Sequence, residues 1–118
     1  MSNKVTCHGA DGTTVMTYHA LDDDSLTPAE IGWVLVVEGN PALTEPQALT
    51  AAEACGDLIT MIDPEHARAS IQVFTGGMIE ALERRATAAT GPDEAALRAR
   101  ADELRAELAQ AAAMLPSG

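Results

Sequence analysis

Basic and aromatic residues are scarce in this sequence of 118 residues. It holds one Trp, one Tyr and one Phe, so the core must be built from Ala, Leu, Ile, Val and Met. No apolar run approaches the roughly 18 residues of a membrane span, and the first residues lack the apolar segment of a signal peptide. Its two cysteines, Cys7 and Cys55, stand apart without the spacing of a metal or redox motif. We therefore expect a cytoplasmic protein with free thiols.

Positive charge is missing from most of the first half of the chain. Between Lys4 and Arg68 there is no Lys or Arg, and residues 1–63 carry ten acidic residues against one base, a formal charge of −9. Residues 64–118 carry eight acidic residues and six Arg, a charge of −2. The first half cannot neutralise itself through internal ion pairs, so it should attract a basic partner and repel nucleic acid and anionic lipid. Direct binding to nucleic acid or to a membrane is therefore disfavoured.

Six acidic residues are the candidate contacts for a basic protein partner. They are Asp22, Asp23, Asp24, Glu30, Glu53 and Asp57. The three consecutive carboxylates diverge along the chain and lack the alternating spacing of a calcium-binding loop, so no metal is expected there. An acidic surface that serves only to keep the protein soluble is the simpler alternative.

The most apolar run of the chain is residues 31–37, which contain Trp33. Before the run, Thr27-Pro28-Ala29-Glu30 matches a capping box with Pro at the first helical position. After the run, Gly39-Asn40-Pro41 is a typical helix stop. These signals favour a buried helix over about residues 28–38, at the centre of the core. A buried strand is the alternative, because periodicity cannot separate helix from strand in so short a run.

A β-hairpin is predicted at the N-terminus. Residues 5–8 and 13–18 are β-prone, and Asp11-Gly12 between them is a hairpin turn signal. With this turn Cys7 faces Met16 across the strand pair, and Val5 faces Tyr18 on the same face of the hairpin. This face should pack on the helices, since an isolated hairpin is marginal in water.

Two groups of side chains contain the residue types of reactive sites, but neither has a suitable arrangement. The first group is Cys7, His8 and His19. In the hairpin Cys7 points away from His8, and His19 lies roughly 13 Å along from His8, too far to share a zinc ion. The second group is Cys55, Asp63, Glu65 and His66. It comes with no oxyanion or phosphate-binding loop. We therefore expect no catalytic residue, no metal and no cofactor.

Three helical segments are predicted after the apolar run. The first begins near Glu45 with Thr44 as its cap, and the second begins with Asp63 as its cap and Pro64 at the first helical position. Gly76-Gly77 inside the second segment would cost about 2 kcal/mol relative to Ala in a helix interior. A break into two shorter helices is favoured there, with a close helix crossing or a hinge as alternatives.

The last helix, about residues 92–115, carries a heptad repeat of apolar residues. They are Leu97, Ala101, Leu104, Leu108, Ala111 and Leu115. Such a seam can pack in an antiparallel helical hairpin within one chain, or it can join two copies as a homodimer. The sequence leaves both open.

The fold predicted is mainly α (α+β), with an N-terminal β-hairpin followed by four to five helices. Residues 1–90 would form the hairpin and helical core, and residues 91–118 the C-terminal helix, packed on the core or forming a dimer seam. The favoured function is a non-enzymatic, acidic interaction or regulatory protein that binds a basic protein partner. In its sharper form the protein is a decoy that imitates nucleic acid.

Two other functions remain open from the sequence. One is a small-molecule-binding or enzymatic domain, whose pocket would be lined by Trp33, Cys55, Phe74 and Met78. The other is a structural subunit of a larger assembly.

Overall fold

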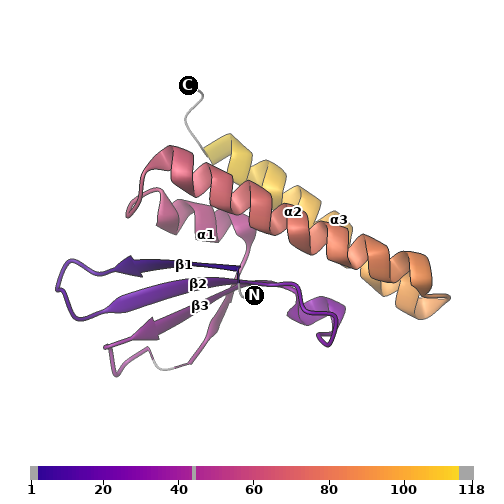
Figure 1. Cartoon of the computed structure of the whole chain (residues 1–118), viewed down its shortest axis with the longest axis horizontal. Coiled ribbons are helices and arrows are strands. Elements are labelled where there is room, and N and C mark those ends of the chain that lie inside the picture. Colours follow the sequence, from indigo (N-terminus) through magenta and orange to yellow (C-terminus); the bar gives the residue numbers. More distant parts are fainter. Residues whose placement is uncertain (1–2, 44, 115–118) are drawn as a thin grey trace.

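Four strands form one antiparallel sheet in the order of the chain, and three helices follow them (Figure 1). This computed structural model describes residues 3–43 and 45–114. The strands are β1 (Asn3–His8), β2 (Val15–Leu21), β3 (Gly32–Glu38) and β4 (Gln47–Leu49). The helices are α1 (Ala51–Leu58), α2 (Pro64–Ala88) and α3 (Pro92–Met114), with a short 3-10 helix η1 (Pro28–Glu30) between β2 and β3. The α+β class is confirmed, but the prediction of four to five helices is wrong.

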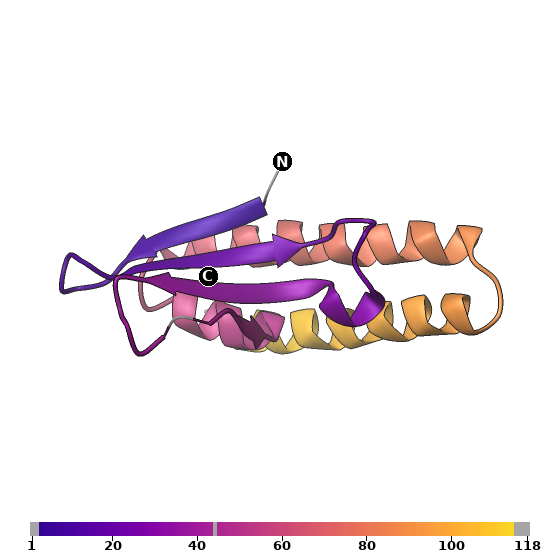
Figure 2. The ribbon, with the colours of Figure 1, turned by 90° about the horizontal axis from the view of Figure 1, so that it is seen from below.

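The helices form one layer and the sheet forms another. Figure 2 shows α2 on the side of β1, whereas α1 and α3 lie on the side of β3. The far end of the α2–α3 pair reaches beyond the sheet and past η1 (Figures 1 and 2). In the part of the chain that the structure describes, α1, α2 and α3 cover one face of the sheet, and none of these three helices lies on its outer face (Figures 1 and 2). No helix among the described residues is long and apolar enough to cross a membrane.

The predicted N-terminal hairpin and its register are confirmed. Cys7 pairs with Met16 and Val5 pairs with Tyr18, which places their side chains on the inner face of the sheet. The Asp11 carboxylate stabilises the connection by accepting hydrogen bonds from the backbone N–H groups of Thr13 and Thr14, both at 2.9 Å. Local turn chemistry therefore fixes this part of the fold.

The helix predicted over residues 28–38 is wrong, because the apolar run forms strand β3. The Glu30 carboxylate does accept a hydrogen bond from the backbone N–H of Thr27, at 2.9 Å, but the helical turn ends after one 3-10 turn. Ile31 is already extended (φ −77°, ψ 121°). Capping signals fit a single turn as well as a long helix, and Val34 and Val36 favour a strand. Pairing with β2 along the whole of β3 then decides the conformation.

The helix predicted to begin near Glu45 begins later. Residues 47–49 form β4, and α1 begins after Thr50. The backbone N–H of Glu53 donates to Thr50 Oγ1 at 3.0 Å, and the backbone N–H of Thr50 donates to Glu53 Oε1 at 3.1 Å. This is a complete capping box that the sequence analysis missed. The predicted cap, Thr44, lies outside the described residues.

The break predicted at Gly76-Gly77 is also wrong, since α2 is continuous from Pro64 to Ala88. Asp63 caps the helix as predicted, accepting hydrogen bonds from the backbone N–H groups of Glu65 and His66 at 3.1 and 3.2 Å. Apolar burial on both sides of the glycine pair offsets the cost of about 2 kcal/mol that two glycines impose. The larger buried apolar residues on either side of the pair are Ile71, Met78, Ile79 and Leu82.

Candidate functional site

The six predicted partner contacts fall into two groups along the chain. Asp22, Asp23, Asp24 and Glu30 lie in the β2–β3 connection, whereas the other two acidic residues lie on α1. The connection and α1 occupy different positions along the long axis of the molecule (Figures 1 and 2). Asp22 is partly buried, and the other five residues are exposed. The structure therefore does not gather all six into one patch.

Hydrogen bonds within the β2–β3 connection favour the charged form of two of its carboxylates, Asp23 and Glu30. Asp23 Oδ1 accepts a hydrogen bond from the backbone N–H of Ser25 at 2.9 Å, and this bond lowers the pKa of Asp23. The bond from the backbone N–H of Thr27 lowers the pKa of Glu30 in the same way. Donors that bind the ionised form favour it, so Asp23 and Glu30 are held in their negatively charged form.

The two acidic residues on α1 also serve the fold. Glu53 completes the N-terminal capping box of α1. Asp57 Oδ2 accepts a hydrogen bond from the buried Tyr18 hydroxyl at 3.0 Å. Burial, with this hydrogen bond as the second cause, raises the pKa of Tyr18 well above its usual value. Contact of Glu53 and Asp57 with a partner stays a prediction.

The heptad seam of α3 packs inside the chain. Leu97, Ala101, Leu104 and Ala111 are buried in the core, and Leu108 is partly buried against it. Leu115 lies outside the described residues. This is the internal helical hairpin, one of the two arrangements that the sequence left open. A second copy could reach these side chains only if α2 and α3 separated, so a homodimer through this seam stays a prediction without support from their placement.

Neither group of reactive side chains forms a site. Among the described residues, no group of three or more His, Cys, Asp or Glu is placed to hold a metal ion. The sulfur of Cys55 lies in the core, 3.9 Å from the carbonyl oxygen of Ala111 on α3, and burial raises the pKa of its thiol. Asp63, Glu65 and His66 are exposed at the start of α2. The thiol and these polar groups are therefore in different environments.

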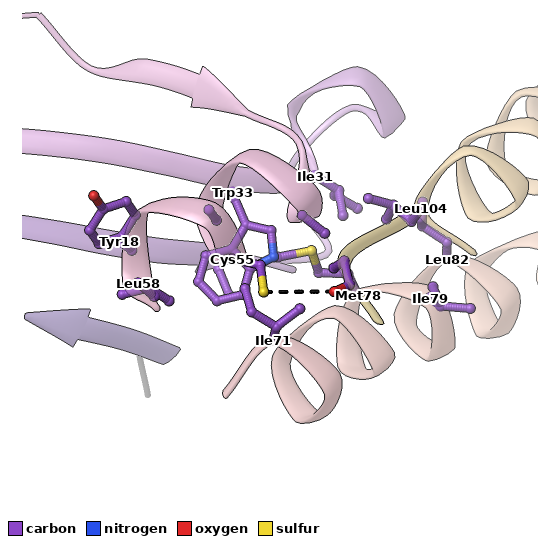
Figure 3. Close-up of a cluster of buried hydrophobic side chains, with 14 of the residues drawn as sticks. Tyr18, Ile31, Trp33, Cys55, Leu58, Ile71, Met78, Ile79, Leu82 and Leu104 are labelled. Atoms are coloured by element: carbon purple, nitrogen blue, oxygen red, sulfur yellow. Dashed lines mark hydrogen bonds between the residues drawn. The ribbon is translucent and has the colours of Figure 1, made fainter. Parts of the chain in front are cut away.

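Three of the four residues of the predicted small-molecule pocket are buried in the core. Trp33, Cys55 and Met78 are 1%, 0% and 0% exposed, and Figure 3 shows all three in the core. The Trp33 ring lies 6.1 Å from the Phe74 ring, and its Nε1 donates a hydrogen bond to Thr75 Oγ1 at 2.9 Å. These residues hold the sheet on α2. None of the four hollows reported for the described residues is lined by all four of them, and the small-molecule function stays a prediction.

The outer face of the sheet is a surface that sequence reasoning missed, because residues 31–37 were expected to be a helix. Its positions on β2 and β3 are partly buried and, apart from His19, apolar or β-branched: Val15, Thr17, His19, Leu21, Val34 and Val36. A hollow of about 640 Å³ lies on this side, between η1, β3 and the residues around Pro46. On β2, Thr17 and His19 alternate with Tyr18 and Ala20 and could have indicated this face, but the continuous apolar run of β3 gives no such signal.

A second hollow lies between the β2–β3 connection and the far end of the α2–α3 pair. Its volume is about 570 Å³, and one nitrogen of Arg85, Nη1, is buried there without a hydrogen-bond partner in the described part of the chain. Asp24 and Asp93 line the same hollow. The cation is thus outnumbered by carboxylates, and the region stays acidic.

A groove runs between β1 and α2. One open hollow of about 430 Å³ lies between these two elements. A second hollow, of about 450 Å³, adjoins it on α2, and the two have four lining residues in common. They are Asp63, His66, Ser70 and Phe74. The groove brings together residues about sixty positions apart in the sequence, so no local pattern could have predicted it.

Comparisons with models of protein families, with curated proteins and with solved structures find no significant match to this chain.

Proposed function

We propose that this protein is a non-enzymatic interaction protein that binds a basic protein partner through the acidic surface of its sheet layer. The sheet layer is defined here as β1 to β4 with the connections between them. The observation that carries the proposal is a separation of charge between the two layers. All six Arg lie on α2 or α3, whereas Lys4 is the one basic residue of the sheet layer.

Seven acidic residues belong to the sheet layer, and all but Asp22 are exposed. They are Asp11, Asp22, Asp23, Asp24, Glu30, Glu38 and Glu45. They stand at both ends of the sheet, in the β1–β2 turn, in the β2–β3 connection and after β3. A surface with this many unbalanced negative charges speeds encounter with a positively charged surface and repels a negative one.

The ionisation of these carboxylates supports the proposal. Hydrogen bonds, chiefly from the backbone N–H of Thr14, lower the pKa of Asp11 to about 2. Backbone hydrogen bonds also lower the pKa values of Asp23 and Glu30. The open, mostly apolar outer face between the acidic ends gives a partner an area to bury, as in interfaces with an apolar centre and a polar rim.

The experiment that tests the proposal compares two variants with the same net charge. In one, Asp22, Asp23 and Asp24 are replaced by Asn; in the other, the exposed Glu80, Asp102 and Glu103 of the helical layer are replaced by Gln or Asn. Proteins of the host lysate are captured on the wild-type chain at about 50 mM and about 500 mM NaCl. The retained protein is then purified, and its affinity for each chain is measured.

A partner of this kind should be basic and released by salt, and the sheet-layer variant should bind it about tenfold more weakly. The helical-layer variant should bind nearly as well as the wild-type chain. Equal losses in the two variants would mean that net charge alone acts, and the proposal would fail. It would also fail if no basic protein were retained at low salt.

The decoy form of this function requires one further property of the partner. The partner must bind DNA or RNA with the surface that contacts this protein, so added nucleic acid should displace the acidic chain. If saturating amounts of this protein leave the affinity of the partner for nucleic acid unchanged, the decoy form is wrong, and the interaction itself can still stand.

A further inference from the structure

The outer edge of β1 is free of strand pairing in the part of the chain that the structure describes. β1 pairs with β2 on one side and spans six residues. An edge strand presents backbone N–H and C=O groups that can form hydrogen bonds with an added strand. Extended peptides use such edges as a general mode of binding. β1 is therefore a possible template for a partner segment.

The groove beside this edge has an apolar floor. Val5, Ile62 and Phe74 line it, each partly buried. Val73 lines its second hollow and is 65% exposed, the highest value among the exposed large apolar residues of the described chain. A strand added to β1 would direct alternate side chains toward α2 and into this groove. Those side chains would bury apolar surface that is now in contact with water.

Both ends of the groove are acidic. Asp63 and Glu65 lie at one end, where α2 begins. At the other end, the carboxylate of Asp22 lies 3.8 Å from the point where a Cβ on Gly77 would stand. Gly77 is three residues beyond Phe74 on α2, and Asp22 follows the residues of β2 that pair with the start of β1. Lys4 is the only Lys or Arg among the residues that line the two hollows, and His66 lines both of them.

We propose that an extended segment of the basic partner adds to the sheet as a fifth strand along β1, in the groove between β1 and α2. Apolar side chains at alternate positions of the segment cover the floor formed by Val5, Ile62 and Phe74. Lys or Arg residues at its two ends face the acidic ends of the groove. This inference rests on the proposed function and specifies how the partner binds.

The test uses the full chain and a synthetic peptide, acetyl-Lys-Lys-Val-Thr-Val-Thr-Val-Lys-Lys-amide. Two derivatives are methylated at the backbone nitrogens of either the Val or the Thr residues. In an added strand, one of these two sets of N–H groups points at β1 and the other points away. One derivative should therefore bind about tenfold or more weakly than the parent peptide, and the other within about threefold of it. In NMR spectra, the amides of β1 should shift most when the peptide binds.

Charge and groove contacts are tested with matched variants on α2. Glu65→Gln removes a charge at the groove, and Glu80→Gln removes one from an exposed position outside it. We expect Glu65→Gln to weaken peptide binding about threefold and Glu80→Gln to leave it unchanged. Lys4→Gln should strengthen binding, because it removes a positive charge from the rim. A peptide with Glu in place of Lys should not bind at the same concentrations.

Four results would overturn the inference. The first is equal binding by the two methylated derivatives, and the second is NMR shifts confined to the outer face or to Asp22–Asp24. Either would place a basic ligand elsewhere on the sheet layer and leave the proposed function intact. The third is concentration-dependent shifts of β1 without peptide, which would mean that a second copy occupies the edge. The fourth is the absence of any peptide binding. The proposed function does not depend on this result, because the capture experiment tests it independently.

Discussion

Arg100 on α3 binds the carbonyl oxygen of Ile31, the residue before β3, through two hydrogen bonds. Its Nε lies 3.0 Å and its Nη2 lies 2.8 Å from that oxygen. Its Nη1 lies 3.4 Å from Glu107 Oε2, and Glu107 Oε1 accepts a hydrogen bond from the backbone N–H of Ala51 at 2.9 Å. This pair of charged residues therefore ties α3 to the beginning of both β3 and α1.

The Arg100 contact should contribute measurably to stability. Arg100→Lys keeps the charge but loses the two-pronged contact with one carbonyl oxygen, so we expect the free energy of unfolding to fall by about 2 kcal/mol. Urea unfolding measures this change. Arg98→Lys is the control, because the Arg98 side chain is 52% exposed, and its effect should stay within about 0.5 kcal/mol. Equal effects of the two substitutions would contradict the structural role of Arg100.

Arg100 lies close against Gly32 and leaves little room there for a side chain. A Cβ at this position would stand 2.8 Å from Arg100 Nη2, so Gly32→Ala should destabilise the wild-type chain. In an Arg100→Ala background the same substitution should cost much less, because the clashing group is gone. A double-mutant cycle of unfolding free energies measures the coupling. Strict additivity of the two changes would show that the close approach has no energetic effect.

The hydrogen bond from Trp33 to Thr75 should matter because both residues are buried. Thr75→Val leaves the indole N–H without its acceptor, and we expect a loss of about 1 to 3 kcal/mol in the free energy of unfolding. Thr75→Ser keeps a hydroxyl and should cost less. Since Trp33 is the only Trp, its fluorescence follows unfolding directly. A Ser variant as unstable as the Val variant would argue against this hydrogen bond.

Tyr18 is the only Tyr of the chain, so its ionisation can be followed by ultraviolet absorption. Its pKa is raised by burial and by the hydrogen bond to Asp57, so the native chain should show no tyrosinate at the usual pKa of about 10. As pH rises, the Tyr18 hydroxyl loses its proton at a lower pH in the unfolded chain than in the native chain. The stabilisation is therefore complete below about pH 10 and declines as pH rises toward the native pKa of Tyr18.

A Tyr18→Phe variant separates this effect from other alkaline changes. It should lose stability less steeply than the wild-type chain above about pH 10, because the ionisable hydroxyl is absent. Titration of the native wild-type chain at the ordinary tyrosine pKa would contradict the buried environment of Tyr18.

Leu104 distinguishes the two uses of the heptad seam. Because this side chain is fully buried within one chain, Leu104→Ala should lower the free energy of unfolding by about 2 to 5 kcal/mol at every protein concentration. If the seam joined two copies, the unfolding midpoint would rise with protein concentration, and the variant would dissociate in analytical ultracentrifugation. Gln110→Ala, at an exposed position of α3, provides the control.

Several features could be read directly from the sequence because neighbouring residues decide them. The Asp11-Gly12 turn and the flanking β-prone residues gave the β1–β2 hairpin with its register. Asp63 before Pro64 gave the start of α2. The acidic character of the candidate surface follows from composition, and its charge distribution follows from the absence of bases between Lys4 and Arg68.

Tertiary contacts decided the rest. Residues 32–38 are a strand because β2 and β4 pair with them on either side, and capping signals carry no information about such partners. The helix passes through Gly76-Gly77 because its packing against the sheet and α3 outweighs a local cost. The groove between β1 and α2 exists because an edge strand and a helix distant in sequence lie side by side. Local propensities act over a few residues, whereas pairing and burial act over the whole chain.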